Sequence, residues 1–219
     1  SKAQGQLFVF DIQLQHRVFG RSGEPVLVRG VPSVRHLLEG DVPAGGDEPL
    51  ALREGRPVVR EEGMTIGAWV IGAQRGIIYL RAEYTYLRPH LESVLQRRRE
   101  AGLLGPAVAG HKDFAFDIAI HMGSGAYVCG EETALIESLE GHRGEPRLKP
   151  PYPAQIGLWG QPTLVQNCET LVNIPHIILR GSQWYASIGT EQSKGPKIFC
   201  VSGHVNRPGN YELPLGVTL

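Results

Sequence analysis

A glycine-bearing loop and the helix expected after it are the first place in the sequence where chemistry could occur. Glycines at 123, 125 and 130 precede Glu131-Glu132-Thr133, which would form the first turn of that helix. Backbone N–H groups at a helix start attract anions such as phosphate, and glycines let a flat ligand approach the main chain closely. Ordinary turn formation, with acidic residues that stabilise the helix dipole, accounts for the same residues. The pattern therefore permits a nucleotide site without requiring one.

The proline-rich segment Pro146–Pro153 carries two cations and an aromatic ring. Arg147, Lys149 and Tyr152 lie within it, and the prolines restrict the freedom of the backbone that holds them. A rigid cation and a flat ring suit a nucleotide, because the charge can meet phosphate or ribose oxygens while the ring stacks on a base. A solvated proline-rich linker would have a similar composition, so both interpretations stay open.

The cysteines and histidines do not suggest a metal centre. The three cysteines include no CxxC pair, and three thiols alone cannot complete a closed zinc site or an iron–sulfur cluster. They are also too scattered for a disulfide framework, which favours a reducing, cytosolic setting. His90, His111 and His121 lack metal-ligand spacing, and we expect structural roles for them. No metal site is therefore predicted in this chain.

Helices and strands are expected to alternate around these segments. The expected helices span residues 64–73, 86–101, 131–139 and 167–180. The expected strands span residues 7–14, 77–80 and 114–121, and in the last of them Phe116, Ile118 and Ile120 fall on one side. The alternation indicates an α/β layered domain with a partly parallel sheet.

The two ends of the chain are expected to differ from this domain, which we assign to residues 62–194. Residues 1–61 are expected to be irregular, because glycine, proline and charged residues dominate most of them, with a possible short helix at 34–38. Strands at 197–203 and 210–213 are expected to begin a small, β-grasp-like domain over residues 195–219, which the chain cuts short.

Composition excludes several classes of protein. The 219 residues fit one domain, or one domain plus part of another. Lys plus Arg number 22 and so do Asp plus Glu, so the overall basic charge typical of a nucleic-acid-binding protein is missing. No apolar run approaches the roughly 20 residues that span a bilayer, and the start of the chain lacks a signal-peptide pattern. We expect a cytoplasmic protein with no nucleic-acid partner and no direct membrane insertion.

Residues 126–141, AYVCGEETALIESLEG, resemble the signature of the 51 kDa (NuoF-type) flavoprotein subunit of respiratory complex I. The resemblance extends over residues 62–219 through separate blocks in the same order and at the same spacing. These blocks are EGM at 62–64, GIIYLR at 76–81, GLLG at 102–105, PRLKPPYP at 146–153, GLWG at 157–160, PT at 162–163, Asn167 with ET at 169–170, GT at 189–190 and SKG at 193–195. The diaphorase subunit of NAD-reducing hydrogenases and the β subunit of NAD-linked formate dehydrogenases resemble residues 80–87 at least as well.

The resemblance implies a Rossmann-like FMN-binding domain and assigns residues to it. The residues implied to lie beside FMN are Tyr127, Gly130, Glu131, Glu132, Gln166 and Asn167. Those implied to contact NADH are Glu132, Lys149 and Tyr152. Tyr152 stands where the family has a phenylalanine that packs on adenine, and a tyrosine can still stack there. Gln166 stands where an asparagine is common.

The same resemblance implies an oxidoreductase that moves hydride from NADH to FMN. The flavin supplies the chemistry while the protein supplies position and electrostatics, so no side chain acts as catalytic acid or base. Electrons then leave through iron–sulfur clusters of a larger complex. The implied partner is the 24 kDa (NuoE-type) iron–sulfur subunit, and the implied 4Fe-4S cluster belongs to a region beyond Leu219. The chain would lie in the cytoplasm, peripheral to the inner membrane as part of that complex.

Departures from the family pattern support an alternative. The family has a loop of the type GRGGAGF, which wraps FMN and NADH, and a segment of the type NADEGEPG before residues 62–64; this sequence has neither. Ala82 also stands where glycine is usual. A truncated or inactive family member that acts only as a structural or docking module is therefore the second hypothesis. An unrelated phosphate-binding α/β protein is the third.

Overall fold

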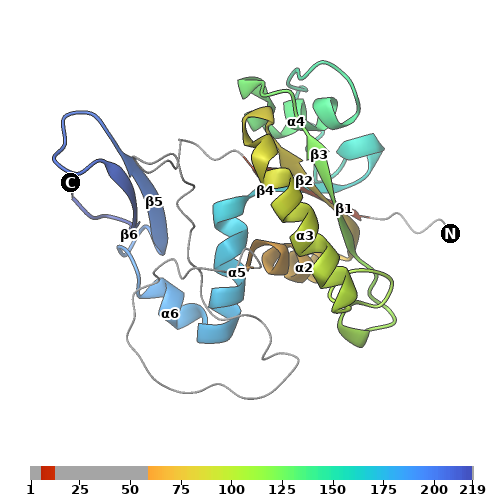
Figure 1. Ribbon diagram of the computed structural model, residues 1–219, viewed down its shortest axis with the longest axis horizontal. Coiled ribbons are helices and arrows are strands. Elements are labelled where there is room, and N and C mark those ends of the chain that lie inside the picture. Colours follow the sequence, from red (N-terminus) through yellow and green to blue (C-terminus); the bar gives the residue numbers. More distant parts are fainter. Residues whose placement is uncertain (1–5, 13–58, 219) are drawn as a thin grey trace. The chain divides into compact units, whose positions relative to one another are not determined.

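The computed structural model describes residues 6–12 and 59–218 (Figure 1). The described chain divides into two compact units: residues 6–12 and 60–171 belong to the first, and Val59 and the residues from Val172 onward belong to the second. The α5 helix (Cys168–Arg180) runs across this division, inside the residues 62–194 expected to form one domain.

A parallel four-stranded sheet organises the first unit. Its strands are β1 (Gln6–Ile12), β2 (Ala73–Leu80), β3 (Asp117–Met122) and β4 (Thr163–Asn167). Their order is β3-β2-β1-β4, and every neighbouring pair is parallel. The carboxyl ends of all four strands therefore meet at one edge. The chain builds outward from β1 to β3 and then returns to the other side of β1, so the order reverses between β1 and β4, where open α/β sheets bind ligands.

Two features of this sheet differ from the sequence-based expectations. The strand expected at residues 7–14 forms as β1, but it pairs with both β2 and β4 and so lies inside the sheet, although the domain was expected to begin only at residue 62. The strand β4 was not predicted, because it is only five residues long and follows a proline-rich loop. The possible helix at residues 34–38 lies outside the described residues.

The expected helices form, with shifted bounds. They are α2 (Val59–Ile71), α3 (Arg88–Glu100), α4 (Glu132–Leu139) and α5, joined by the 3₁₀ turns η1 (Ala82–Leu87), η2 (Val108–Gly110), η3 (Tyr127–Gly130) and η4 (Leu158–Gly160). The helix expected from residue 86 begins at Arg88, because η1 occupies the preceding residues and Pro89 starts the α-helical turn. The expected alternation of helix and strand is confirmed.

One face of the sheet packs against Met64 of α2. Gly76 and Ile78 of β2 pair with Ile118 and Ile120 of β3, so these residues share a face. A Cβ atom on Gly76 would lie 2.7 Å from the Phe116 ring and 3.0 Å from the Met64 terminal methyl, so these buried side chains fill the space above the glycine. The predicted shared side of Phe116 and Ile118 is consistent with this packing.

The opposite face positions α4. Tyr79 of β2 is buried with Leu135, Ile136 and Leu139 of that helix, and its hydroxyl lies 2.9 Å from Ser138 Oγ. A side chain at Gly123 would collide with the Tyr79 hydroxyl, so only glycine lets the loop after β3 cross the ring. The packing of Tyr79 against α4 and against the loop at Gly123 therefore fixes the start of this helix relative to the sheet.

The second unit holds a short helix and a hairpin. Its elements after α5 are α6 (Ser182–Ala186), β5 (Pro196–Val201) and β6 (Gly209–Pro214). The two strands pair antiparallel from Pro196 with Pro214 to Val201 with Gly209, which confirms the two strands expected near the end of the chain. Among the helices that the structure describes, none has the length and apolar character of a membrane span.

Candidate functional site

The candidate site lies where the loop after β3 leads through η3 into α4. Tyr127 and Gly130 belong to η3, and both are exposed, Tyr127 with 81% of its surface open to solvent. This segment thus presents an aromatic ring and accessible main chain. Both properties suit a flat ligand.

Glu131 caps the helix that follows. Its Oε2 accepts hydrogen bonds from the backbone N–H groups of Thr133 at 2.9 Å and Ala134 at 3.1 Å, and from the Thr133 hydroxyl. The N–H groups that the sequence offered as an anion site are therefore already occupied by a carboxylate. With Glu131 in this position the helix start does not suit a phosphate, which favours ordinary capping, while the anion-site interpretation of these residues stays a prediction.

Lys149 binds both glutamates from the proline-rich loop. Its Nζ donates to Glu131 Oε1 at 2.8 Å and to Glu132 Oε1 at 2.5 Å. The structure thus brings together three of the predicted site residues, which lie up to 18 positions apart. The Lys149 side chain is 28% exposed and each glutamate side chain 37%, so the group is accessible to a ligand.

Electrostatics keep this group ionised. Hydrogen bonds from Lys149 to Glu131, and then to Glu132, raise the pKa of the ammonium above its usual value. Partial burial opposes ionisation of the Glu131 carboxyl, but the hydrogen bonds from Lys149, Thr133 and Ala134 outweigh it and hold that pKa below its usual value. Each shift favours the charged form, so Lys149 and Glu131 form an ion pair at neutral pH.

Arg147 anchors the same loop to the far end of α4. Its guanidinium donates to Glu137 through Nε, to Glu140 Oε2 at 2.6 Å through Nη2 and to the Gly157 carbonyl at 3.3 Å through Nη1. Its backbone N–H donates to Thr133 Oγ1 at 2.8 Å. Four bonds therefore fix one residue of the loop to the helix and to the segment before η4.

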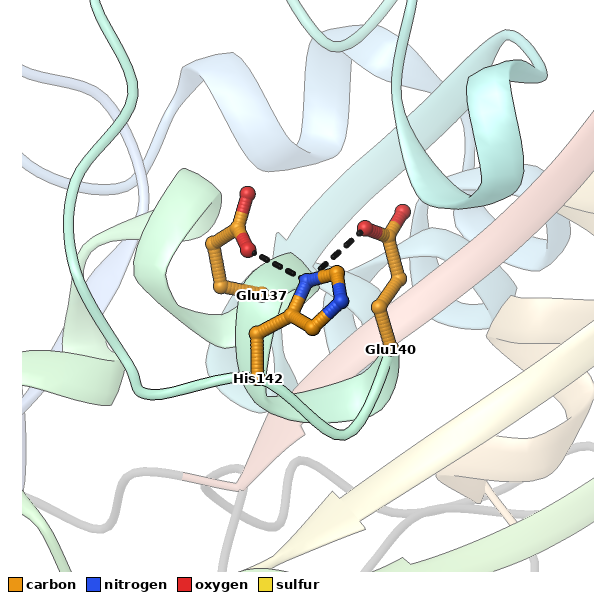
Figure 2. A group of neighbouring side chains, drawn as sticks. All are labelled: Glu137, Glu140 and His142. Atoms are coloured by element: carbon orange, nitrogen blue, oxygen red, sulfur yellow. Dashed lines mark hydrogen bonds and ion pairs between the residues drawn. The ribbon is translucent and has the colours of Figure 1, made fainter.

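His142 completes this cluster (Figure 2). Its Nδ1 lies 2.8 Å from Glu137 Oε2 and 3.8 Å from Glu140 Oε2. The ligand atoms of the two glutamates and the histidine lie within 4.8 Å of one another, as in a metal site. Both carboxylates already bind Arg147, however, so a cation is in place without a metal ion.

Tyr152 lies farther along the loop, and 55% of its surface is exposed. Its backbone N–H donates to Gln155 Oε1 at 3.3 Å, which fixes the main chain and leaves the ring at the surface. The ring is therefore available for stacking.

Asn167 and Gln166 lie at the carboxyl end of β4. Gln166 pairs with Phe10 of β1, and Asn167 pairs with Asp11. Asn167 Oδ1 accepts from the Thr170 backbone N–H and hydroxyl, both at 2.9 Å, so it caps α5. The register places both residues at the reversal point of the sheet. They share the carboxyl edge with the η3–α4 segment.

Sequence reasoning missed a contact at the end of β2. Arg81 donates to Glu83 Oε1 at 2.5 Å and to the Gly125 carbonyl at 3.4 Å, and so links the loops after β2 and β3. The available signal was a charged pair directly after a buried strand, since such positions face the ligand edge of an α/β sheet. Thr133, whose hydroxyl joins Glu131 to Arg147, was missed as well.

Comparison with known proteins assigns the chain to a family. The model of the Nuo51 FMN-binding domain of the complex I 51K type matches residues 46–176. The chain belongs to this family. A model of the SLBB domain also matches residues 198–219, which contain most of the hairpin of the second unit.

Similar proteins carry related names. An NADH-quinone oxidoreductase subunit of Rhizobium meliloti (strain 1021) is 49% identical over 158 residues, which are 72% of this chain and 37% of the relative. The alpha subunit of the NAD-reducing hydrogenase HoxS of Cupriavidus necator is 52% identical over 157 residues, 72% of this chain and 26% of the relative. The chain therefore spans about a quarter to two-fifths of these relatives.

A solved structure supports the same fold. A chain of an NAD⁺-reducing [NiFe]-hydrogenase in the H₂-reduced state superposes with a TM-score of 0.69 at 40% sequence identity, over 99% of this chain and 32% of the other. The expected resemblance to complex I and hydrogenase flavoproteins is confirmed, and so is the α/β fold class.

The residues present fit FMN in part. Exposed main chain at Gly130, the exposed ring of Tyr127 and the amide of Asn167 suit the ring and ribityl groups of a flavin. The side-chain carboxylate of Glu131 on the α4 N–H groups does not suit its phosphate. By their chemistry, these residues therefore fit the ring and ribityl groups of FMN better than its phosphate.

Proposed function

We propose that this chain is the FMN- and NADH-binding part of an oxidoreductase subunit, which takes hydride from NADH onto FMN and passes electrons to iron–sulfur clusters of a larger complex. The observation that supports this most is the group Glu131–Lys149–Glu132 at the carboxyl edge of the sheet, in a chain of the Nuo51 family. Relatives named NADH-quinone oxidoreductase and NAD-reducing hydrogenase support the choice of substrate.

The proposed contacts divide between two ligands. Beside FMN we place the η3 segment with Tyr127 and Gly130, the glutamates 131 and 132, and the residues Gln166 and Asn167. Beside NADH we place Glu132, Lys149 and Tyr152. FMN, when bound, would supply the hydride acceptor and the route for single electrons.

The protein groups bind and orient. An ammonium has three N–H donors, and Lys149 uses two of them on the glutamates, so the third can reach a ligand oxygen. The Glu132 carboxylate can accept from ribose hydroxyls. A carboxylate beside the ribose favours free hydroxyls over a 2′-phosphate, which it would repel.

The larger setting belongs to the same proposal. We infer that the chain works beside a 24 kDa (NuoE-type) iron–sulfur subunit, with a 4Fe-4S cluster held outside the residues of this chain. We place that complex in the cytoplasm, peripheral to the inner membrane. The relatives are themselves named as subunits, which supports a multi-subunit setting.

A flavin titration tests the proposal. We expect the chain to quench FMN fluorescence on binding, and NADH to bleach the flavin absorbance of the complex. Glu132→Gln should weaken NADH binding about tenfold, since it removes a charged hydrogen-bond acceptor. Glu145→Gln, which changes an exposed glutamate paired with Arg143, is the matched control. Unchanged FMN affinity and unchanged bleaching in Glu132→Gln would remove Glu132 from the site.

A docking module is the second candidate. The Glu131 carboxylate on the α4 N–H groups favours it, because that contact disfavours phosphate at the helix start. This candidate requires a colourless protein that binds neither FMN nor NADH and still associates with a partner subunit. The flavin titration therefore separates the two candidates directly.

A further inference from the structure

Arg147 and Lys149 attach the proline-rich loop to α4 at two points. Lys149 binds the glutamates at the first turn of the helix, while Arg147 binds Glu137 in the second turn and Glu140 just after the last residue. The two cations are separated only by Leu148, whose side chain is 92% exposed and contributes little packing. The loop is therefore held to the helix mainly through these two charged contacts.

A continuous set of hydrogen bonds links the two points. The Arg147 backbone N–H donates to Thr133 Oγ1, the Thr133 hydroxyl donates to Glu131 Oε2, and Glu131 Oε1 accepts from Lys149. Thr133 is buried, so the middle of this link is shielded from water, while its Lys149 end stays partly exposed. A shift of Arg147 would therefore displace Thr133 and, through it, the Glu131 carboxylate that binds Lys149.

The arginine contacts form a network and not a single surface pair. Hydrogen bonds from Arg147, and then from His142, hold the pKa of Glu137 below its usual value. Glu140 uses its second oxygen to accept from the Trp159 backbone N–H at 2.7 Å, so the arginine joins the helix, the loop and η4. A planar guanidinium can satisfy three separate acceptors in this way, whereas an ammonium cannot match the geometry.

We propose that Arg147 is a positioning residue, which holds the loop so that the Lys149 ammonium lies between Glu131 and Glu132, ready for the dinucleotide. The role of Lys149 in binding NADH rests on the proposed function. The positioning of Lys149 by Arg147 does not depend on that function. Preorganising a binding lysine in this way lowers the cost of ordering it when the ligand arrives.

The rate of lysine acylation tests whether Arg147 positions Lys149, and the test needs no ligand. An ammonium in two ion pairs reacts slowly with an amine-directed acylating reagent, and mass spectrometry reports the rate at Lys149. We expect Arg147→Gln to raise that rate about tenfold, by weakening the ordered ion pairs. Arg143→Gln, at an arginine that is nearly fully exposed and paired only with Glu145 among the described residues, should leave the rate unchanged. Arg147→Lys should restore part of the slow rate.

NADH titrations then test whether the positioning of Lys149 by Arg147 contributes to NADH binding. Lys149→Gln and Arg147→Gln should each raise the Kd for NADH about tenfold, and the double variant should be no more than about twofold weaker than Lys149→Gln alone. A purely structural arginine would weaken binding by the same factor in both backgrounds. Thermal melting of each variant shows that the chain is folded.

The outcomes distinguish the positioning role of Arg147 from the proposed binding of NADH. Unchanged acylation of Lys149 in Arg147→Gln, or additive losses of NADH affinity, would overturn the positioning role. A wild-type chain that binds no NADH, but whose Lys149 acylation still rises in Arg147→Gln, would support the hold and refute the proposed function.

Discussion

At the scale of single residues, one carboxylate performs two tasks. Glu131 caps α4 with Oε2 and binds Lys149 with Oε1. The helix start and the candidate binding group are thus coupled, because a shift of the cap moves a partner of the lysine. The Thr133 hydroxyl strengthens this coupling, since it donates to Glu131 and accepts from the Arg147 backbone.

Thr133→Val should therefore destabilise the fold. The variant keeps the shape of the buried side chain but removes both hydrogen bonds, leaving the Arg147 N–H without its acceptor. We expect a loss of about 1–3 kcal/mol in the free energy of unfolding. Urea denaturation measures it. Thr133→Ser, which keeps the hydroxyl, is the control, and equal stability of the valine and serine variants would contradict the role of the hydroxyl.

The candidate site shows what could be predicted for single residues. The resemblance assigned Glu131, Glu132 and Lys149 to one site, and the structure joins them by direct hydrogen bonds. The capping role of Glu131 could not be predicted, because it depends on which side chain reaches the first N–H groups of the helix. The assignments of all the predicted site residues to FMN or NADH, Glu131, Glu132 and Lys149 included, stay predictions.

At the scale of elements, the crossing of α2 with the start of α5 depends on a glycine. A Cβ atom on Gly63 would collide with the carbonyl oxygen of Leu171, a backbone atom that cannot rotate away. The absence of a side chain therefore sets how closely these two helices approach.

Gly63→Ala should destabilise the chain although it lies within a helix. Alanine at an ordinary helical position is about 1 kcal/mol better than glycine. The collision with Leu171 should reverse the sign and cost about 1–3 kcal/mol. Chemical denaturation followed by circular dichroism gives the value. Gln96→Ala in α3, at an exposed position, should change stability by no more than about 0.5 kcal/mol. A stabilised Gly63→Ala variant would show that the helices can separate freely.

The local sequence pattern predicted where most helices and strands lie, but it did not predict which strands pair with one another. The periodicity of α3 and the apolar run of β2 identified both, and the hairpin strands were found from their turn. A five-residue strand such as β4 carries too little periodicity to be recognised after a proline-rich loop. The position of β1 between β2 and β4 was also not predictable, since strand pairing is a non-local property.

At the scale of the whole molecule, stability should depend on pH through a buried histidine. Burial, and then the nearby charge of Arg180, lowers the pKa of His176 to about 4 from a usual value of 6.5. The folded chain therefore holds this ring neutral at neutral pH. Below pH 6.5 the unfolded chain binds a proton that the folded chain does not, so acid favours unfolding.

The stability of the folded chain should fall as pH drops from 6.5 toward 4 and lose no more from this group below 4. The full effect is on the order of 3 kcal/mol. Urea unfolding at several pH values measures it, and His176→Gln should flatten the curve over this window. His204→Gln, at an exposed position, should keep the wild-type slope. An unchanged slope in His176→Gln would assign the acid sensitivity to other groups.

The order of strands also has a consequence for assembly. β1 pairs with β4 from Leu7 with Thr163 to Asp11 with Asn167, so the two partners are joined by more than 150 intervening positions. Bringing such distant segments together costs chain entropy that only the finished contact repays. During synthesis the ribosome must release residue 167 before the pairing of β1 with β4 can be completed. Under the proposed function, a nucleotide can therefore bind at this edge of the sheet only after β4 has been synthesised and has paired with β1.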